Sequence, residues 1–281
     1  MQNIQQGIYR NISLEEYHLG PGLSSSNLCE LNRSPLHYIT IMKNPRPQTP
    51  AMKLGAATHC AILEPERFEI EYSKAPDVDK RTKDGKAIWN ELEKSGKIVL
   101  NADEYLKVSE MASAIRHHKL ASKLLQGGAP EQSIYWKQRV SYLDADDILC
   151  KSRPDYIKPL KNGYVIVDIK TTQDANIFEF QKKAYYKWHY YLQAAHYIRG
   201  FKAVTQGEVI AFMYVVIESE PPYAISIFKA GDDYLKAGER KTQELYELYA
   251  NCVTNNNWPS YYNGIQELRL PKNVLGNYHE N

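Results

Sequence analysis

The most constraining feature of the sequence is an apolar run that is interrupted by one acidic and one basic residue. Residues 163–172 read Gly-Tyr-Val-Ile-Val-Asp-Ile-Lys-Thr-Thr. The three consecutive β-branched residues Val165–Val167 indicate a buried strand. Asp168 and Lys170 are two residues apart, so their side chains project from the same face of that strand. Because a buried charge is costly unless it is paired or bound to a metal ion, this pattern predicts a polar site within an α/β core.

A second carboxylate is expected beside the first. The segment Ser152–Tyr156 contains Pro154-Asp155, and we expect it to form a strand next to the one that carries Asp168. Two carboxylates and water molecules suit Mg²⁺ or Mn²⁺. Such an ion lowers the pKa of a bound water and stabilises charge on a phosphoryl oxygen, and a nearby lysine orients or deprotonates the water. The alternative is a surface hairpin in which Asp168 and Lys170 form an ordinary ion pair.

Length and composition are those of a globular protein. The chain has 281 residues, of which 43% are hydrophobic and 24% are charged, and this excludes collagen-like, low-complexity and disordered chains. The longest apolar run, Val209–Ile217, has about half the length that a membrane-spanning helix needs. The N-terminus lacks the apolar segment of a signal peptide. We therefore expect a cytoplasmic protein without membrane contact.

Neither the net charge nor the cysteines identify a ligand. The net charge is only +2, so a nucleic-acid partner has to be argued from local patches. Residues 31–63 contain no acidic side chain, and lysines alternate with aromatic residues over 182–191. The four cysteines form no Cys-x-x-Cys pair, which argues against a zinc ribbon or a cysteine-ligated iron–sulfur cluster. We expect free thiols without a catalytic role.

The order of predicted elements indicates a mixed central β-sheet flanked by helices. Strands are predicted over 133–140, 147–156, 163–170, 208–217 and 224–229. Helices are predicted after the capping residues 24–27 and over 36–42, 52–63, 85–95, 103–125, 176–199 and 231–251. We expect one catalytic module over residues 1–281. Its parts are a mainly helical N-terminal region (1–125), the catalytic sheet and helices (126–255) and a polar tail (256–281).

Pro154-Asp155 followed by Asp168-x-Lys170 resembles the signature of the PD-(D/E)xK nuclease superfamily, which has a restriction-endonuclease-like core. Within it, the sequence resembles the nuclease domain of exonuclease VIII (RecE-type) from about residue 7 to about residue 255. The segment Gly55–Pro65 resembles that family's helix with a metal-binding histidine. Further resemblance lies in two N-terminal segments, Leu23–Ser26 and Ser34–Tyr38, and in a Gln-x-x-x-Tyr element at Gln193–Tyr197.

The resemblance implies a metal-dependent active site. His59, Asp155 and Asp168 are the implied ligands of one or two Mg²⁺ ions, and the carbonyl group of Ile169 is a further implied ligand. Mn²⁺ is an acceptable substitute, because it also accepts carboxylate and imidazole ligands. Lys170 is the residue implied to orient the attacking water. Without the resemblance, His59 is better explained as a satisfied histidine of the core.

Four more polar residues are candidates for the active site or for contacts with DNA next to it. Gln193 and Tyr197 are four residues apart in the predicted helix and share a face with His189, so amide, phenol and imidazole together could hold a phosphate or a terminal nucleotide. An amphipathic helix that turns polar residues to solvent is the alternative. The resemblance also implies an additional active-site glutamate from an earlier segment, for which Glu131 is the candidate. A solvated loop glutamate explains Glu131 equally well.

Five residues after the catalytic pair are candidates for contacts with DNA. The hydroxyl groups of Thr171 and Thr172 suit phosphate oxygens. Lys182, Lys183 and Lys187 lie on or near the next predicted helix, where interleaved aromatic residues would provide stacking surfaces. The alternative is an ordinary helix whose aromatic residues belong to the core.

The resemblance implies a metal-dependent exonuclease that digests linear double-stranded DNA from 5′ to 3′ and releases 5′-phosphomononucleotides. The remaining 3′ tail would serve a RecT-like annealing protein in phage or prophage recombination, and a homotetrameric ring is implied. A CRISPR-adaptation or RecB-type nuclease is an alternative, but it is disfavoured because only Cys252 lies near the C-terminus. A DNA-end-binding module without catalysis is the other alternative, and the retained Asp155, Asp168 and Lys170 argue against it.

Overall fold

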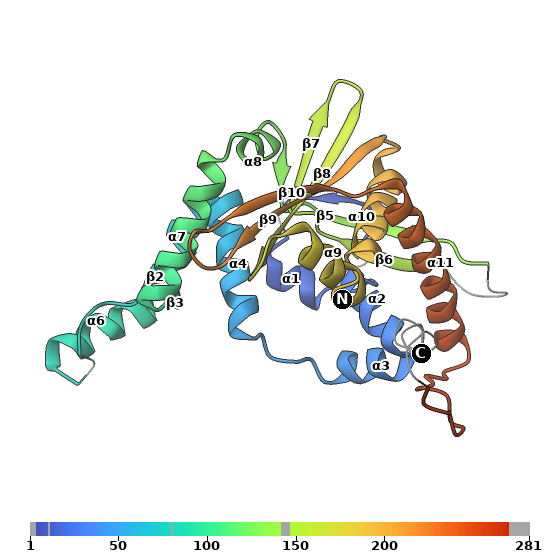
Figure 1. Cartoon of the computed structure of the whole chain (residues 1–281). Coiled ribbons are helices and arrows are strands. Elements are labelled where there is room, and N and C mark those ends of the chain that lie inside the picture. Colours follow the sequence, from blue (N-terminus) through green and yellow to red (C-terminus); the bar gives the residue numbers. More distant parts are fainter. Residues whose placement is uncertain (1–3, 11, 80, 142–146, 270–281) are drawn as a thin grey trace, which may run out of the picture.

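The computed structural model describes residues 4–10, 12–79, 81–141 and 147–269. Its centre is a five-stranded mixed sheet with the strand order β10-β9-β8-β7-β4 (Figure 1). Strands β8 and β9 are parallel, and the other neighbours in this sheet are antiparallel. The strands are β4 (Ala129–Pro130), β7 (Tyr156–Leu160), β8 (Gly163–Thr172), β9 (Val209–Glu218) and β10 (Ile225–Lys229).

A second sheet and a small strand pair complete the β-structure. The antiparallel sheet β1-β5-β6 comprises β1 (Gly7–Tyr9), β5 (Ser133–Gln138) and β6 (Ile148–Ser152). Strands β2 (Tyr72–Lys74) and β3 (Ile98–Leu100) form a parallel pair. The prediction of a mixed sheet with flanking helices is confirmed, but the expected single sheet is divided into two.

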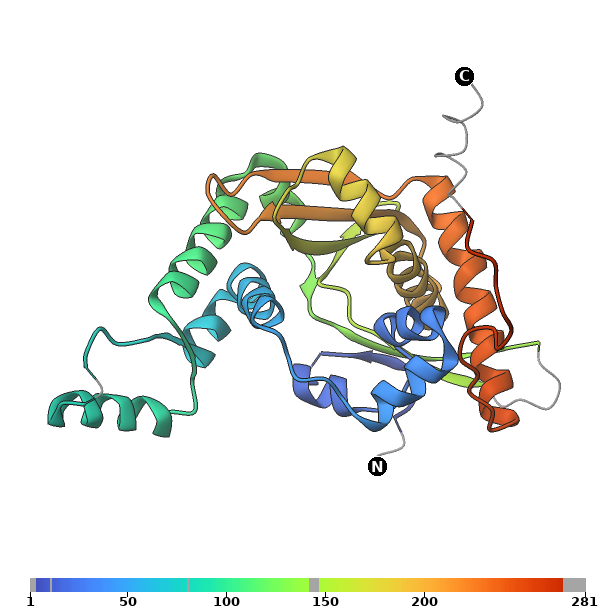
Figure 2. The same cartoon turned by 60° about the horizontal axis from the view of Figure 1, so that its bottom comes forward.

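Helices surround both sheets. The N-terminal half contains α1 (Leu14–Leu19), α2 (Ser25–Arg33), α3 (Pro35–Lys43), α4 (Pro50–Leu63), α5 (Pro65–Glu71), α6 (Lys83–Lys94), α7 (Ala102–His117) and α8 (Lys119–Leu124). The C-terminal half contains α9 (Ile177–Tyr186), α10 (Tyr190–Thr205) and α11 (Asp232–Thr254). In two views of the chain, α6 projects from the body together with the β2–β3 pair (Figure 2). None of the helices among the described residues is long and apolar enough to cross a membrane.

The two faces of β8 belong to different cores. Val165, Val167 and Ile169 pack in a cluster with residues of α7. Ile166 belongs to the larger cluster, which includes residues of α10 and α11. Because side chains alternate along a strand, Asp168 and Lys170 project on the side of Ile166. The strand therefore directs its two charged residues toward α10.

Three predicted elements are interrupted at residues that do not continue them. The predicted strand 147–156 is divided into β6 and β7, because Pro154 has no backbone N–H for the ladder. The predicted helix 176–199 is divided into α9 and α10, because the backbone of His189 is left-handed, with φ of 51°. The predicted helix 103–125 is likewise divided, at the extended residue His118 between α7 and α8. The four cysteines are free thiols, as expected.

We expect Gly238→Ala to destabilise the fold by about 1–3 kcal/mol, because it overpacks the contact between α10 and α11. Gly238 is buried in α11, and a Cβ atom there would overlap with the backbone carbonyl oxygen of Tyr191 in α10. The measurement is urea unfolding. The control is Glu239→Ala at the exposed neighbouring position, for which we expect a change within about 0.5 kcal/mol. Equal stability of the two variants would contradict this packing.

Candidate active site

The antiparallel pair β7–β8 brings two carboxylates together. Tyr156 lies opposite Val167, so Asp155, directly before β7, lies next to Asp168 in β8. Both residues are buried, and Asp168 is only 1% exposed. The backbone N–H of Ile169 donates a hydrogen bond of 2.6 Å to Oδ2 of Asp155. This burial contradicts the alternative of a surface hairpin with an exposed ion pair.

Lys170 is the partner of Asp168. Its Nζ lies 2.6 Å from Oδ2 of Asp168 and 4.4 Å from the ring centroid of Tyr190, which stacks on Trp188. Oδ1 of Asp168 has no hydrogen-bond partner among the described residues, so the contact with Lys170 satisfies only one of the two carboxylate oxygens. A buried carboxylate with unused acceptor capacity is the kind of group that a divalent cation satisfies.

Helix α4 places His59 beside Asp155. The helix begins at the capping residue Thr49 and at Pro50, and a Cβ atom at Gly55 would lie 3.8 Å from Oγ1 of Thr171 in β8. Helix α4 therefore runs close to β8 at this position, with room for no more than a small side chain. At the next turn, Nδ1 of His59 lies 3.4 Å from Oδ1 of Asp155.

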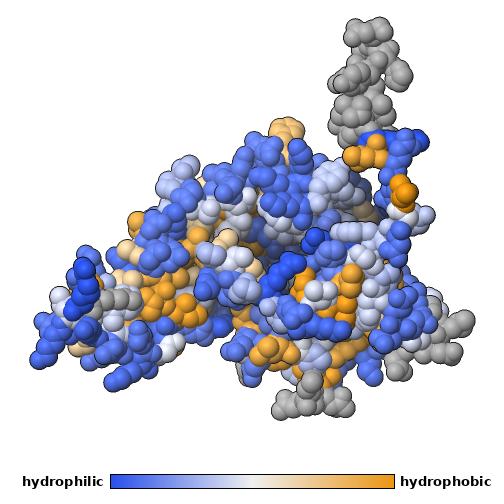
Figure 3. All heavy atoms as spheres, turned by 90° about the horizontal axis from the view of Figure 1, so that it is seen from below, coloured by the Kyte–Doolittle hydropathy of each residue, from blue (hydrophilic) through white to orange (hydrophobic). Residues whose placement is uncertain are grey.

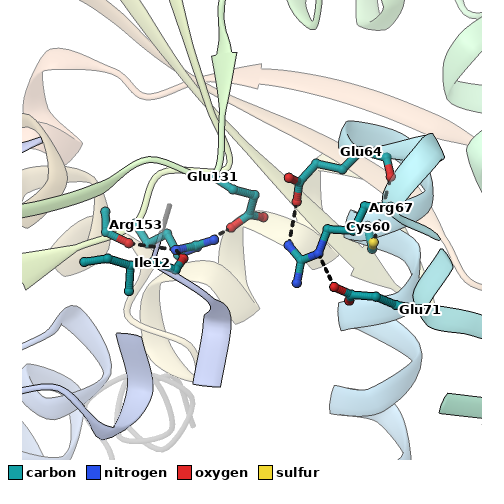
Figure 4. A network of polar contacts seen from close by, with 8 residues as sticks. Ile12, Cys60, Glu64, Arg67, Glu71, Glu131 and Arg153 are labelled. Atoms are coloured by element: carbon teal, nitrogen blue, oxygen red, sulfur yellow. Dashed lines mark hydrogen bonds and ion pairs between the residues drawn. The ribbon is translucent and has the colours of Figure 1, made fainter. Parts of the chain in front are cut away.

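Glu131 enters the site from the turn between β4 and β5. Its backbone is left-handed, with φ of 49°, and its N–H donates to the carbonyl oxygen of Asp155 at 3.0 Å. Its Oε2 accepts a hydrogen bond of 2.7 Å from Nε of Arg153 (Figure 4). The alternative of a solvated loop glutamate is wrong, because the Glu131 side chain is only 16% exposed.

His59, Glu131 and Asp155 form a cluster in which one ligand atom of each lies within 4.8 Å of the others. One imidazole and two carboxylates suit Mn²⁺ and are acceptable to Mg²⁺. Asp168 lies outside this cluster and borders Asp155 from the neighbouring strand. Of the predicted ligands, the structure therefore groups His59 and Asp155 with Glu131. The N–H of Ile169 contacts the site through Asp155, whereas a role for its carbonyl group stays a prediction.

Burial and pairing shift the pKa values of these groups in different directions. Burial opposes protonation of His59, but Asp155 and Glu131 outweigh it and raise the pKa to about 9. Burial raises the pKa of Asp168 to about 6, despite Lys170. Burial and the charge of Asp155 likewise raise the pKa of Glu131 to about 6.

Asp155 and Lys170 stay charged at neutral pH. Burial works against the charge of Asp155, but His59, Lys170 and the Ile169 amide lower its pKa. Burial also works against the ammonium group of Lys170, but the adjacent Asp168 raises its pKa above the usual value. The lysine is therefore suited to orient a water molecule and to stabilise negative charge, and is unsuited to remove a proton.

Gln193 and Tyr197 share a face of α10, and Nε2 of Gln193 donates to Oη of Tyr197 at 3.2 Å. Tyr197 lines a cavity of about 180 Å³ together with His59, Glu131 and Asp155. His189 precedes α10 in a left-handed conformation, so the helical spacing that placed it on this face does not apply. The structure thus places Tyr197 at the cluster with Gln193 as its hydrogen-bond partner, and His189 precedes α10 as its N-cap residue.

The candidate DNA-contact residues differ in exposure. Thr172 is buried, and its hydroxyl is engaged with the backbone of Asp174. Thr171 is half-buried beside α4. Lys182 and Lys187 are exposed, and Lys183 is half-buried with Nζ 4.0 Å from Glu179. A contact between Thr172 and phosphate is therefore blocked in this structure, and the role of the lysines stays a prediction.

The sequence comparison identifies the family. A model described as "PDDEXK-like domain of unknown function (DUF3799)" matches residues 24–271. The chain belongs to this PDDEXK-like family. No curated protein matches the sequence. The PD-(D/E)xK prediction is thereby confirmed, whereas membership of the exonuclease VIII group stays a prediction.

A comparison with solved structures supports the fold. A crystal structure from Eubacterium rectale, described as a "Putative exonuclease", aligns with a TM-score of 0.58 at 12% identity and covers 94% of this chain and 98% of its own. The crystal structure of SSO0001 aligns with a TM-score of 0.38 at 14% identity, covering 84% of this chain and 82% of its own. The second likeness is too weak to support an argument.

Two residues of the site were not singled out from the sequence. Arg153 stands next to the Pro-Asp motif, and this position was the only available signal for it. Tyr190 lies in an aromatic-rich stretch that does not indicate which ring faces Lys170. Both act through contacts between segments that are distant in the sequence.

We expect the affinity for Mn²⁺ to rise with pH between about pH 7 and pH 8.5, by up to about tenfold per unit, because the ion has to displace the proton of His59. The pKa of His59 is raised to about 9, so this imidazole is mostly protonated at the lower pH. Isothermal titration calorimetry in two buffers also reports the released proton. His59→Ala should bind more weakly and lose most of this pH dependence. An unchanged slope in that variant would contradict the assignment.

Proposed function

We propose that the protein is a divalent-metal-dependent exodeoxyribonuclease that degrades linear double-stranded DNA from 5′ to 3′ and releases 5′-phosphomononucleotides. The observation that carries the proposal is the buried carboxylate of Asp168, which lies next to Asp155 and pairs with Lys170 through Oδ2, while its Oδ1 has no hydrogen-bond partner among the described residues. A structural or purely DNA-binding protein would gain nothing from such a costly group. The description of the Eubacterium rectale structure as an exonuclease supports the same class of activity.

The residues of the chain have separable tasks in this proposal. His59, Glu131 and Asp155 would hold Mg²⁺ or Mn²⁺, with Asp168 at its border. When bound, the ion lowers the pKa of a water ligand and stabilises negative charge on the scissile phosphate. Lys170, held in place by Asp168 and Tyr190, orients the attacking water and stabilises the developing charge. Tyr197 closes one side of the cavity.

Helix α9 supplies a surface suited to a DNA strand. Phe178, Lys182 and Tyr186 are spaced by four residues and so share one face of the helix. The two aromatic residues are 79% and 74% exposed, and the lysine is exposed. Exposed aromatic rings next to lysines fit the stacking and charge requirements of nucleic acid. Seen from below, the molecule is hollowed near its centre between mainly hydrophilic side chains (Figure 3).

The same proposal includes the use of the product. A 3′ single-stranded tail is the substrate of a RecT-like annealing protein, and a ring-shaped homotetramer would keep the enzyme on its DNA. These two elements rest on the resemblance to exonuclease VIII.

We expect purified protein with Mg²⁺ to release a 5′-end label from linear duplex DNA early, as mononucleotide, and to release a 3′-end label late. A closed circular duplex should stay intact. Lys170→Met should lower kcat by at least about 10²-fold, because it removes stabilisation of the transition state, and should bind Mn²⁺ no more weakly than the wild type. Cleavage of the circle would contradict an exonuclease, and early loss of the 3′ label would contradict the polarity. No cleavage of any DNA with Mg²⁺ or Mn²⁺ would overturn the proposed activity.

We expect the double variant Lys182→Ala/Lys187→Ala to bind DNA more weakly. The slope of log K against log salt concentration should fall in magnitude by up to about two, because each lysine that contacts a phosphate contributes about one to this slope. The measurement is fluorescence anisotropy with end-labelled duplex in Ca²⁺, over a series of salt concentrations. The charge-matched control is Lys86→Ala/Lys94→Ala, at two exposed positions of α6. An equal loss in both double variants would argue against a specific path along α9.

A further inference from the structure

Arg153 is a buried cation that donates hydrogen bonds to three residues from two segments that are distant in the sequence. Its side chain is 6% exposed. Nε donates to Oε2 of Glu131 at 2.7 Å, and Nη1 donates to the carbonyl oxygen of Ile12 at 2.8 Å and to Oγ of Ser133 at 2.7 Å. Burying an arginine costs free energy that its hydrogen bonds have to offset. A guanidinium group in such a position is an effective clamp, because its donors have a fixed planar geometry.

We propose that Arg153 is a positioning residue of the metal site. Arg153 holds Glu131 in the orientation for binding a cation. It also fixes the N-terminal segment, which forms one wall of the cavity, to Glu131. The inference rests on the proposed metal-dependent function and deepens it. Arg153 takes Oε2 of Glu131 and so leaves Oε1 for the cation. Partners behind a ligand of this kind set its orientation and contribute to metal affinity.

The backbone of Glu131 supports this role. A non-glycine residue with positive φ is strained, and the surrounding structure has to impose that conformation. Two contacts do so, namely the N–H of Glu131 to the carbonyl oxygen of Asp155 and its carboxylate to Arg153. Both contacts lead back to the segment that carries the Pro-Asp motif. The positions of two candidate ligands, Glu131 and Asp155, are thereby coupled.

The N-terminal segment is also held by β6, the strand that ends directly before Arg153. Lys151 lies two residues before Arg153, and its Nζ donates to the carbonyl oxygens of Tyr17 at 2.7 Å and Gly20 at 2.5 Å. Leu14, Tyr17 and His18 of α1 line the cavity beside His59. The match to the family model begins at residue 24, so this wall comes from the part of the chain that precedes the match. Arg153 connects that wall to the metal cluster.

Arg67 provides a matched comparison within the same cavity. It lies in α5, lines the cavity and pairs with two carboxylates, Glu64 at 2.8 Å and Glu71 at 2.6 Å. Figure 4 shows the two arginine networks facing each other from opposite sides, with separate acidic partners. Neither partner of Arg67 belongs to the cluster of His59, Glu131 and Asp155. Loss of Arg67 changes the charge near the site without releasing a ligand.

The test measures Mn²⁺ affinity from the electron paramagnetic resonance signal of the free ion, in the full chain at constant pH. We expect Arg153→Met to weaken Mn²⁺ binding about 10–100-fold, as is typical for the loss of a partner behind a metal ligand. We expect Glu131→Gln, which alters the ligand itself, to weaken binding at least as much. The double variant should bind like Glu131→Gln alone, because Arg153 acts through Glu131. Arg67→Met should bind like the wild type. Hydrogen exchange of the α1 amides should accelerate in Arg153→Met and remain unchanged in Arg67→Met.

Arg153→Lys keeps the test decisive if Arg153→Met does not fold. Lysine retains the charge but lacks the fork of donors, so we expect weaker Mn²⁺ binding at a melting temperature that shows a folded protein. Wild-type affinity in a folded Arg153→Lys variant would overturn the inference. Wild-type or tighter affinity in Arg153→Met would overturn it too, since tighter binding would mean that Arg153 competes with the ion. Additive losses in the double variant would overturn it as well. Absence of Mn²⁺ binding by the wild type would instead refute the proposed metal-dependent function.

Discussion

The interaction on which the site depends is the pairing of each buried carboxylate with one buried or half-buried cation. Asp155 pairs with His59, Asp168 with Lys170 and Glu131 with Arg153. Three unpaired carboxylates within the core would each cost several kcal/mol, and together this is comparable with the whole stability of a typical domain. Among these cations, the imidazole is the one whose proton a metal ion can displace at mildly alkaline pH, because its pKa of about 9 is within reach there. A divalent ion can therefore replace the charge of His59 while Lys170 and Arg153 keep theirs.

This arrangement also explains why the site is assembled from so many segments. Strand β8 supplies Asp168 and Lys170, the segment before β7 supplies Asp155 and Arg153, and separate elements supply His59 and Glu131. Each of these segments is held by at least one contact to another. The N–H of Ile169 holds Asp155, and the carbonyl oxygen of Asp155 holds the backbone of Glu131. These contacts hold the candidate ligands close together before any ion binds. Such preorganisation reduces the free-energy cost of binding the ion.

The sequence predicted the part of the site that is encoded by local pattern. A buried strand with Asp168 and Lys170 on one face, and a second carboxylate on the adjacent strand, follows from alternation and burial alone. His59 required the resemblance to a family, because an isolated histidine in an apolar helix carries no local signal for a ligand. The division of 176–199 at His189 and the contact of Tyr190 with Lys170 depend on tertiary packing. The helical periodicity of the sequence continues through His189, and it therefore indicates neither the break at His189 nor the contact between Tyr190 and Lys170.

The position of Lys170 limits the chemistry that the site can perform. Asp168 and the ring of Tyr190 both favour the ammonium form, and the adjacent Asp155 favours it further. A lysine that has to remove a proton requires the opposite environment, with apolar burial or neighbouring cations that lower its pKa. The residues around Lys170 therefore select an electrostatic role over a role as a base. In the proposed reaction, a bound ion would instead acidify the attacking water, and the cluster of His59, Glu131 and Asp155 would hold that ion beside the free Oδ1 of Asp168.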